Sequence, residues 1–360
     1  MTVRSLPFPA SGNLGDLIRP DVPRESLAVI DLSASGRRWS WAKLDAAAEG
    51  FASSLVRAPL PTDARVAILA ENCAEYLIAY LGTMRAGCVS VPVNQRLPPD
   101  TVRYILADCA AQLCIVDAAC EALVPSALAR IVMRSPGAAA LEARGPAAVP
   151  LERRTPPQTG EILYTSGSTG RPKGVVLSHA GQLWALSVHV AATPMAGERS
   201  LIVAPLYHMN ALFNVSVCLL NGIEVVLMPR FDAAAYLKAV AEYRCTLLSG
   251  IPTMFALMAR QRERLARLDL SSVKAVTIGS APLTEALVAR VQEMFRRRRS
   301  ATATARPKRD PRSSRIIPRD CRDRSCRSAI RCRMSKCGSR AERATQGCCT
   351  CAPRRCSPST

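Results

Sequence analysis

The sequence predicts an α/β protein over residues 1–295, with parallel-type sheets and flanking helices, followed by a tail of a different kind. Between residues 38 and 295, short apolar runs typical of buried strands alternate with stretches of helical periodicity. Such alternation is typical of a parallel sheet covered by helices. The tail, residues 296–360, contains no Leu, Val, Phe, Tyr or Trp. The two regions are therefore interpreted separately.

The first part of the chain is expected to contain three helices and three strands. Ser40 is a capping residue for an amphipathic helix, and Gly87 ends a second helix. The expected helices cover 38–56, 73–87 and 98–109. The expected strands cover 65–70, 88–94 and 111–117. Residues 134–160 are rich in Pro, Ala and Gly, which predicts a surface connection between subdomains at about 20–133 and 160–295.

The same alternation continues after residue 160, with five strands and five helices. The expected strands cover 161–166, 200–205, 224–229, 245–250 and 273–280. The expected helices cover 180–192, 211–221, 232–243, 252–266 and 283–295. No internal repeat is visible in the sequence.

Charge and cysteine are both concentrated in the tail. The formal net charge of the chain is +20, but residues 296–360 hold 20 of the 48 Lys and Arg and 4 of the 28 Asp and Glu. The tail therefore carries +16, and residues 1–295 carry +4, a balance typical of a soluble enzyme. Eight of the 15 cysteines lie between Cys321 and Cys356. The other seven are scattered through apolar runs, which favours buried free thiols in a reducing compartment.

The N-terminal residues predict no targeting to a membrane or to the secretory route. They lack the apolar stretch of a signal peptide. No apolar stretch is long enough for a membrane span, since even 211–228 is interrupted by Asn214, Asn221 and Glu224. A cytoplasmic location is expected.

The most informative segment is YTSGSTGRPKGVVLSH at 164–179, which follows an expected strand. Its glycines allow backbone amides to approach an anion closely, and its hydroxyls add hydrogen-bond donors. The glycines are Gly167, Gly170 and Gly174, and the hydroxyl residues are Thr165, Ser166, Ser168 and Thr169. Lys173 supplies a mobile cation, so the segment suits a polyphosphate. It is not a Walker loop, because Gly174 stands where that loop has Ser or Thr.

These residues resemble the adenylate-forming superfamily, which includes acyl-CoA synthetases, peptide-synthetase adenylation domains and luciferases. YTSGSTGRPKGV is similar to its phosphate-loop signature at every position. APLYHMNAL at 204–212 and IGSAPL at 278–283 resemble two later motifs, and residues 79–109 resemble the N-terminal subdomain of CoA ligases. The resemblance covers about residues 20–295 and implies the large N-terminal domain of that superfamily.

The resemblance also implies a reaction and a site. A carboxylate would attack the α-phosphate of Mg²⁺-bound ATP to give an acyl-adenylate and pyrophosphate, and a thiol, usually that of CoA, would then displace AMP. Residues 165–170 and Lys173 would hold the β- and γ-phosphates. His208 would line or gate the acyl pocket, with a satisfied core histidine as the alternative. The nucleotide and acyl group would be contacted by Gly279, Ser280, Ala281 and Pro282. The expected partners are thus a small carboxylate, ATP and CoA.

Several parts of the superfamily pattern are not found after Phe295. They are the Tyr-Gly-x-Thr-Glu motif, the Asp for the ribose, the hinge and the lid domain with its catalytic Lys. No catalytic residue can therefore be assigned, and this form of the chain is expected to be inactive or crippled.

Three interpretations of the tail compete. Its charge would suit a basic nucleic-acid-binding protein built on a degenerate ligase domain, but it has no aromatic platform, so only non-specific binding is expected. A zinc site is not favoured, because Cys348 and Cys351 have no matching pair. A segment so poor in apolar residues should be disordered.

The third interpretation is a shift of reading frame near Arg296–Arg299. The residues from Ala303 to Pro311 allow codons that begin with GC, AC, GC, CG, CC, AA, CG, GA and CC. Joining those two bases to the preceding third base permits Gly-Tyr-Gly-Thr-Thr-Glu-Ala-Gly-Pro, which contains the missing Thr-Glu motif. The same shift explains the abundance of Cys and Arg. A truncated adenylate-forming domain with an out-of-frame tail is therefore the main prediction.

Overall fold

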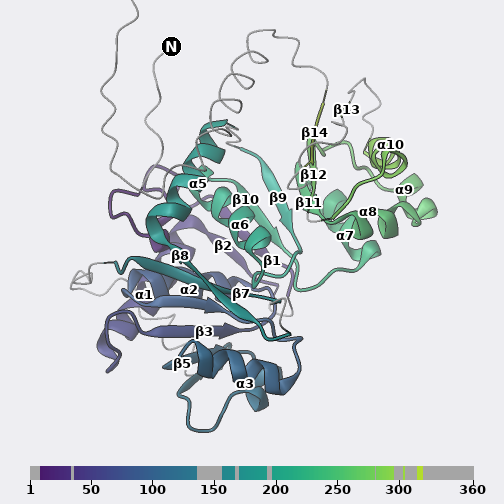
Figure 1. The fold of residues 1–360 in the computed structure, drawn as a ribbon. Helices are drawn as coiled ribbons and strands as arrows, with labels where there is room; N and C mark the ends of the chain where they lie inside the picture. The colour runs from purple at the N-terminus through teal and green to yellow at the C-terminus, as the bar shows by residue number, and fades with distance from the viewer. Residues whose placement is uncertain are drawn as a thin grey trace, which may run out of the picture.

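The structure of the protein is a computed structural model. This structure describes residues 9–33, 36–135, 156–166, 170–192, 197–279 and 281–295, together with the backbone of 303–304 and 314–318. Two sheets and their helices make up this part of the chain (Figure 1). The prediction of parallel-type sheets with flanking helices is confirmed.

The smaller sheet has six strands in the order β6-β5-β3-β4-β7-β8. They are β3 (Arg65–Leu69), β4 (Val89–Pro92), β5 (Leu113–Val116), β6 (Arg130–Val132), β7 (Thr159–Thr165) and β8 (Lys173–Ser178). Every neighbouring pair is parallel except β7 and β8, which form an antiparallel hairpin. β8 is therefore the edge strand, and its Val175 and Val176 are 43% and 62% exposed.

The larger sheet has eight strands in the order β13-β14-β12-β11-β9-β10-β1-β2. They are β1 (Leu27–Asp31), β2 (Arg38–Ser40), β9 (Arg199–Ile202), β10 (Glu224–Leu227), β11 (Leu247–Gly250), β12 (Ala275–Ile278), β13 (Ala303–Thr304) and β14 (Ser314–Pro318). The strands from β1 through β10, β9 and β11 to β12 are parallel. Their carboxyl ends consequently lie along one edge of this sheet.

Helices cover both sheets and fill the space between them. The helices are α1 (Trp41–Arg57), α2 (Ala74–Arg85), α3 (Pro99–Asp108), α5 (His179–Ala192), α6 (Met209–Asn221), α7 (Ala233–Glu242), α8 (Pro252–Ala259), α9 (Arg262–Arg267) and α10 (Glu285–Met294), with short 3₁₀ turns η1 (Leu14–Asp16) and η2 (Ala118–Leu123). α7, α8 and α10 lie beside the eight-stranded sheet, and α3 lies below the six-stranded sheet in the view of Figure 1.

Three apolar clusters follow from these layers. The largest joins α1, α2, α5 and α6 to both sheets, so these helices form a shared middle layer. The second packs α7, α8 and α10 on the outer face of the eight-stranded sheet, and the third packs α3 on the six-stranded sheet. Within one strand the residues alternate between clusters: Val225 belongs to the first and Val226 to the second.

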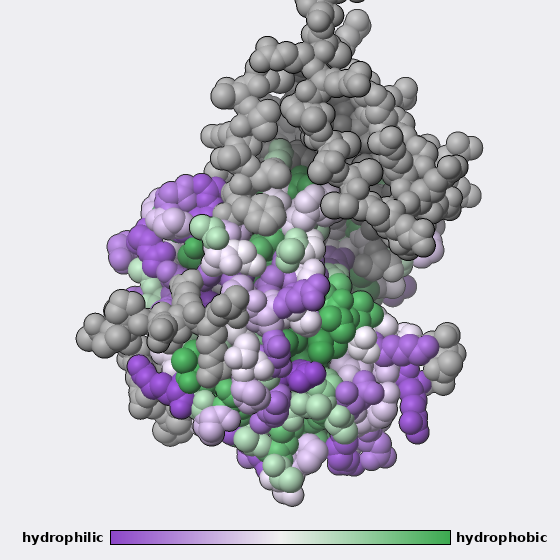
Figure 2. All heavy atoms as spheres, turned by 60° about the vertical axis from the view of Figure 1, so that its left-hand side comes forward, coloured by the Kyte–Doolittle hydropathy of each residue, from purple (hydrophilic) through white to green (hydrophobic). Residues whose placement is uncertain are grey.

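The surface retains some apolar side chains. Trp184 and Val188, one turn apart on α5, are 64% and 45% exposed, and Met209 at the start of α6 is 39% exposed. Figure 2 shows hydrophobic residues gathered between hydrophilic ones on the face that comes forward from the left of Figure 1. No helix in the described part of the chain is both long enough and apolar enough to cross a membrane. The seven cysteines before residue 295 are buried, and none of them forms a disulfide with another described cysteine, as expected.

Most expected elements are present, and Ser40 caps α1 by accepting a hydrogen bond from the Lys43 amide. The expected helix 252–266 is instead two helices, α8 and α9. α8 buries Met254, Phe255 and Met258, whereas α9 has no fully buried residue, and the backbone of Gln261 between the two helices is non-helical. The expected connection at 134–160 is described only at its ends.

The sequence predicted two subdomains joined at 134–160, but the two sheets are not separated at this point of the chain. β1 and β2, from the first part of the sequence, join the eight-stranded sheet, whereas β7 and β8 join the six-stranded sheet. The sequence pattern locates strands but carries no information on which sheet each strand joins, so the exchange was not predictable from periodicity.

Two short segments of the tail differ from the expected disorder. β14 pairs antiparallel with β12, and β13 pairs with β14. A strand edge offers unpaired backbone groups whatever the side chains of its partner. In a β-α-β unit the helix connects two parallel strands. Because β14 is antiparallel to β12, the segment β12, α10 and β14 is not such a unit. The rest of 296–360 lies outside the described residues.

Candidate functional site

The glycine-rich loop connects the two strands of the β7–β8 hairpin. Thr165 pairs with Lys173, so this pair closes the loop. Thr165, Ser166, Gly170 and Lys173 are exposed. Gly167, Ser168 and Thr169 lie outside the described residues. Gly170 has φ +85°, a left-handed conformation that favours glycine. Within the described part of the chain Lys173 has no ion-pair partner, so its ammonium group is available to an anion.

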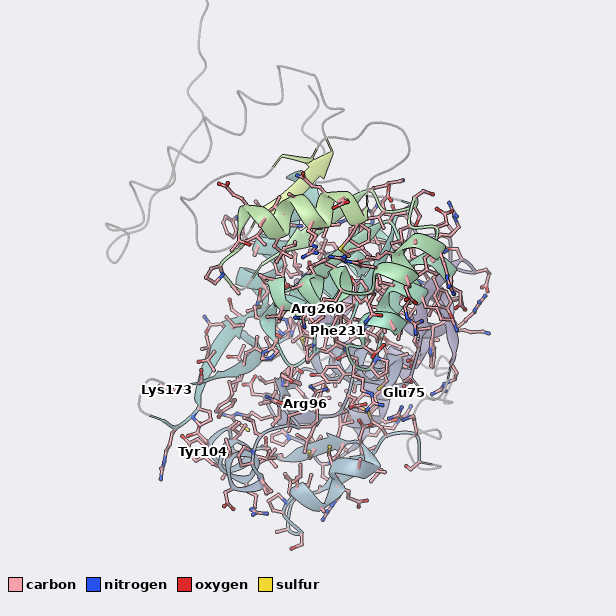
Figure 3. All side chains as sticks on the ribbon, turned by 90° about the vertical axis from the view of Figure 1, so that its right-hand side faces the viewer. Glu75, Arg96, Tyr104, Lys173, Phe231 and Arg260 are labelled. Carbon is pink, nitrogen blue, oxygen red and sulfur yellow. The ribbon has the colours of Figure 1, made fainter. Side chains whose placement is uncertain are left out.

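Close contacts hold this hairpin against α3. The Tyr164 hydroxyl donates a hydrogen bond of 2.6 Å to Asp108 at the end of α3, and the Arg171 guanidinium lies 5.5 Å from the centre of the Tyr104 ring. A Cβ on Gly174 would lie 3.0 Å from Ile162 and 3.1 Å from Tyr164. Figure 3 shows Lys173 at the outer edge of the molecule, on the same side as Tyr104. The described residues at both ends of the loop are thus exposed on an anchored base.

His208 lies at the amino terminus of α6 and is exposed, so it is not the core histidine of the alternative interpretation. Its backbone is extended, and its side chain does not cap the helix. The ring lies 4.5 Å from that of the buried Tyr207. Partial desolvation lowers the pKa of His208, which favours the neutral ring.

The segment after β12 is the third part of the expected site. The Gly279 amide donates a hydrogen bond of 3.1 Å to the carbonyl of Gly250, at the end of β11. Ala281 and Pro282 are exposed, and Ser280 lies outside the described residues. A Cβ on Gly279 would have no neighbour within 4 Å, so there is open space above this turn.

The topology brings His208 and Gly279 to one edge of the eight-stranded sheet. β9, β11 and β12 are parallel neighbours, and both residues follow carboxyl ends of these strands. The phosphate loop follows the carboxyl end of β7 in the other sheet. Asn72, just beyond β3, donates hydrogen bonds to the carbonyls of Ala204 and Met228, which follow β9 and β10. The carboxyl edges of the two sheets therefore meet on one side of the molecule, where ligands of α/β proteins bind.

The other two histidines have structural surroundings. His179 is 3% exposed and its Nδ1 accepts a hydrogen bond of 3.0 Å from the Leu14 amide. His189 packs edge-on against Phe213. Among the residues that the structure describes, no three His, Cys, Asp or Glu side chains are grouped so that they could hold a metal ion. The described residues therefore form no metal site with three such protein ligands.

Sequence reasoning missed a buried carboxyl close to the phosphate loop. Glu161 of β7 is 2% exposed and accepts hydrogen bonds from the Tyr80 hydroxyl at 2.9 Å and the Gln182 amide at 2.8 Å. Burial raises the pKa of Glu161 to about 7. It also missed Asn72. In the sequence, Glu161 and Asn72 are each a polar residue beside an apolar run. That pattern is too common to identify them as functional residues.

Comparison with known proteins gives consistent results. Residues 20–303 match the AMP-binding enzyme family. The chain is 36% identical to a feruloyl-CoA synthase of an Amycolatopsis species over 261 residues, covering 71% of this chain and 52% of that protein. It is 30% identical to the long-chain-fatty-acid–CoA ligase FadD13 of Mycobacterium tuberculosis over 266 residues, covering 70% and 52%. The chain thus spans about half the length of these relatives.

Solved structures agree with the sequence relatives. The N-terminal domain of FACL13 from Mycobacterium tuberculosis superposes with a TM-score of 0.71 at 27% identity, over 78% of this chain and 73% of that one. ATP-bound MatB from Rhodopseudomonas palustris gives a TM-score of 0.70 at 26% identity, over 79% and 58%. The matched family segment, 20–303, contains the phosphate loop, His208 and the turn after β12. The chain belongs to the AMP-binding enzyme family.

Proposed function

We propose that residues 1–295 carry the nucleotide- and acyl-binding part of an acyl-CoA synthetase. The observation that carries this proposal is the exposed, cation-bearing hairpin loop, anchored on the side of the molecule where both sheets end. The CoA ligases among the relatives support a carboxylate as the acyl donor and CoA as the acceptor. The location would be cytoplasmic.

The reaction would have two steps. A carboxylate oxygen attacks the α-phosphorus of ATP, and the bond to the pyrophosphate oxygen breaks. The thiol sulfur of CoA then attacks the acyl carbon, loses its proton, and AMP leaves. In the first step negative charge develops on pyrophosphate, and Lys173 with the amides of residues 165–170 would stabilise it. His208, neutral at pH 7, would line the acyl side, and Gly279–Pro282 would contact the nucleotide.

Mg²⁺ would neutralise phosphate charge when bound with ATP, but the Thr-Glu motif that handles it in the superfamily is not found after Phe295. We therefore expect weak ATP binding and no carboxylate-dependent pyrophosphate exchange from the 360-residue chain. Robust exchange would contradict this part of the proposal.

The test of the phosphate loop is a pair of lysine variants. Lys173→Ala should weaken ATP binding on the order of tenfold, since a charge-assisted contact is lost. Lys238→Ala is the matched control, because Lys238 is an exposed lysine on α7, away from the loop. Isothermal titration with ATP measures both. Equal affinities for the two variants would contradict the assignment of Lys173.

The same proposal includes the tail, which we interpret as out-of-frame translation that starts near Arg296–Arg299. Restoring the frame between codons 294 and 301 should give a product with the Thr-Glu motif, a ribose Asp, a hinge and a lid Lys. That product should form an acyl-adenylate and transfer it to CoA, because positioning and charge stabilisation would be complete. Sequencing the coding DNA across codons 290–315 is the direct check.

A second candidate function rests on the +16 charge of residues 296–360. Such a segment can bind nucleic acid without sequence preference, with an affinity that falls steeply with salt. A shift assay with the full chain and with residues 1–295, at two salt concentrations, separates this candidate from the first. Salt-sensitive binding that requires the tail would favour it.

A further inference from the structure

A buried asparagine lies where the two sheets meet. Asn72 is 2% exposed and occupies the turn between β3 of the six-stranded sheet and α2. Its Nδ2 donates to the carbonyls of Ala204 at 3.0 Å and Met228 at 3.1 Å. Its Oδ1 accepts from the Leu206 amide at 2.8 Å. One side chain thus uses its amide hydrogens and its oxygen on backbone groups just beyond β9 and β10 of the eight-stranded sheet.

The backbone around Asn72 is itself fixed from both sheets. Asp117, at the end of β5, accepts a hydrogen bond of 2.7 Å from the Glu71 amide. Asp31, at the end of β1, accepts one of 2.9 Å from the Ala74 amide. Both aspartates are buried, at 6% and 0% exposure. The residues on either side of Asn72 are therefore held by one carboxylate from each sheet, which leaves its side chain little freedom to move.

The segment that Asn72 grips leads directly to His208. Ala204 and Leu206 are two residues apart, so their hydrogen bonds to Asn72 fix the backbone on both sides of Pro205. The Pro205 carbonyl in turn accepts from the His208 amide at 3.0 Å. His208 begins α6 immediately after this turn. A displacement of the turn would therefore displace His208.

We infer that Asn72 is a positioning residue that sets the location of His208 relative to the phosphate loop. This inference rests on the proposed function, because it treats His208 and the loop as two parts of one site. The loop belongs to the six-stranded sheet and His208 to the eight-stranded sheet, so the reaction needs a fixed relation between the sheets. Misplacement by about 1 Å can reduce a reaction rate on the order of a hundredfold.

A purely structural role is the competing explanation, and a matched control separates the two. Asn13 is also buried, at 4% exposure, and makes two side-chain hydrogen bonds: its Nδ2 donates to the Met84 carbonyl and its Oδ1 accepts from the Gly15 amide. These contacts involve η1 and α2 and do not reach residues 204–208. Asn13→Ala therefore removes a similar buried amide without releasing the His208 segment.

The neighbourhood of Asn72 should tolerate a shortened side chain. A cavity of about 400 Å³ borders it, lined by Glu71, Arg134 and Arg230 among others. Water from this cavity could hydrate the carbonyls of Ala204 and Met228. Asn72→Ser is the second, milder variant, since its hydroxyl can still hydrogen-bond one backbone group.

The experiment follows the histidine signals of the full-length chain by NMR as the pH is varied. The chain has three histidines, so His208→Ala assigns the His208 signal. We expect Asn72→Ala and Asn72→Ser to change the chemical shift and the titration midpoint of His208, with little change at His189. Asn13→Ala should leave His208 as it is. ATP titration of Asn13→Ala and of the two Asn72 variants should give affinities within about twofold of each other, because the hairpin that carries the loop is anchored to α3 and not to residues 204–208.

Each outcome decides the question. An unchanged His208 signal in both Asn72 variants, or an equal change in Asn13→Ala, would overturn the inference. Loss of the fold in both Asn72 variants would assign Asn72 to stability alone and would also overturn it. A chain that fails to bind ATP at all would contradict the proposed function, whereas the His208 signals would still report on positioning.

Discussion

The two sheets hold their parts of the candidate site in different ways. The six-stranded sheet carries the phosphate loop at its edge, on a hairpin anchored by residues of its own sheet and of α3: Tyr164 to Asp108, Arg171 to Tyr104, and Gly174 against Ile162. The eight-stranded sheet carries His208 on a turn held by Asn72, which comes from the other sheet.

The difference between these anchors shows which part of the candidate site depends on both sheets. The anchors of the loop come from the same sheet and from the helix that covers it, so the loop can form once that sheet forms. The contacts of Asn72 join residues 132 to 156 positions apart in sequence, so the turn at 204–206 requires both sheets. The following experiments test this contrast, from the largest expected effect to the smallest.

Replacing Arg85 tests whether the sheets can fold separately. Arg85 is 3% exposed in the shared middle layer and makes ion pairs with Asp16, Asp45 and Glu49. Arg85→Met removes the buried cation that pairs with three carboxylates, of which Asp45 keeps its ion pair with Arg24, and we expect a loss of about 3 kcal/mol or more in the free energy of unfolding. Urea unfolding followed by circular dichroism and by tryptophan fluorescence should show one transition, since both sheets use this layer.

The control for that variant is Arg103→Met. Arg103 pairs with Asp100 on the surface of α3, with side chains 49% and 95% exposed, so the expected loss is within about 1 kcal/mol. Two separate transitions in Arg85→Met would show that the sheets fold independently and would remove the basis of the contrast.

The buried carboxyl of Glu161 makes the loop-bearing sheet sensitive to pH. Its pKa is raised from 4.5 to about 7 by burial, so the folded state binds the proton more tightly than the unfolded state. Its favourable contribution is fully present below pH 4.5 and is lost as the pH rises to about 7. Glu161→Gln is neutral throughout. The stability of the wild type relative to Glu161→Gln should therefore fall by about 3 kcal/mol between about pH 4 and about pH 8.

Tyr80→Phe provides the second measurement for Glu161. The Tyr80 hydroxyl donates to the carboxylate and so lowers its pKa, opposing the effect of burial. Removing this donor should raise the folded-state pKa further, so the loss of stability should extend to higher pH. Thermal melting over the same pH range measures both variants. A difference between wild type and Glu161→Gln that does not vary with pH would contradict the assignment.

The sequence predicted the parts of this molecule that depend on neighbouring residues. Helix α1 begins at the expected Ser40 cap, and the phosphate loop lies at the end of an expected strand. Both depend on spacing within a few residues, which periodicity and capping rules describe. The strand β8 was not expected, because KGVVLS is a short apolar run directly after a turn segment and shows no clear period.

The parts that the sequence did not predict depend on distant contacts. Nothing near Asn72 indicates that it binds Ala204 and Met228, and nothing near β1 indicates that it pairs with β10. The raised pKa of Glu161 comes from burial under helices that are not adjacent in sequence. The sequence therefore predicted parallel-type sheets with flanking helices, but it did not predict the contacts that join the two sheets.

Replacing one glycine in a turn of each sheet tests whether the two turns differ in backbone strain. Gly170 has φ +85°, and a Cβ at this position would have no atom within 4 Å, so Gly170→Ala adds backbone strain alone. We expect a loss of about 1 kcal/mol in stability. Gly279, in the turn after β12, also has open space, and its φ is outside the left-handed region, so Gly279→Ala should change stability by less than about 0.5 kcal/mol. Chemical unfolding of both variants measures this, and equal losses would contradict the strain assigned to the loop.

The smallest expected effect concerns the anchoring of the hairpin to α3. Tyr164→Phe removes the 2.6 Å hydrogen bond to Asp108, whereas Tyr104→Phe removes a longer one of 3.2 Å to the same carboxylate. We expect Tyr164→Phe to lower stability by about 0.5–1 kcal/mol and Tyr104→Phe by less. If the loop is anchored locally, Tyr164→Phe should also speed amide exchange in β8 and leave the His208 signal unchanged. A change at His208 would mean that the anchor of one sheet reaches the other, and the contrast between local and long-range positioning would then fail.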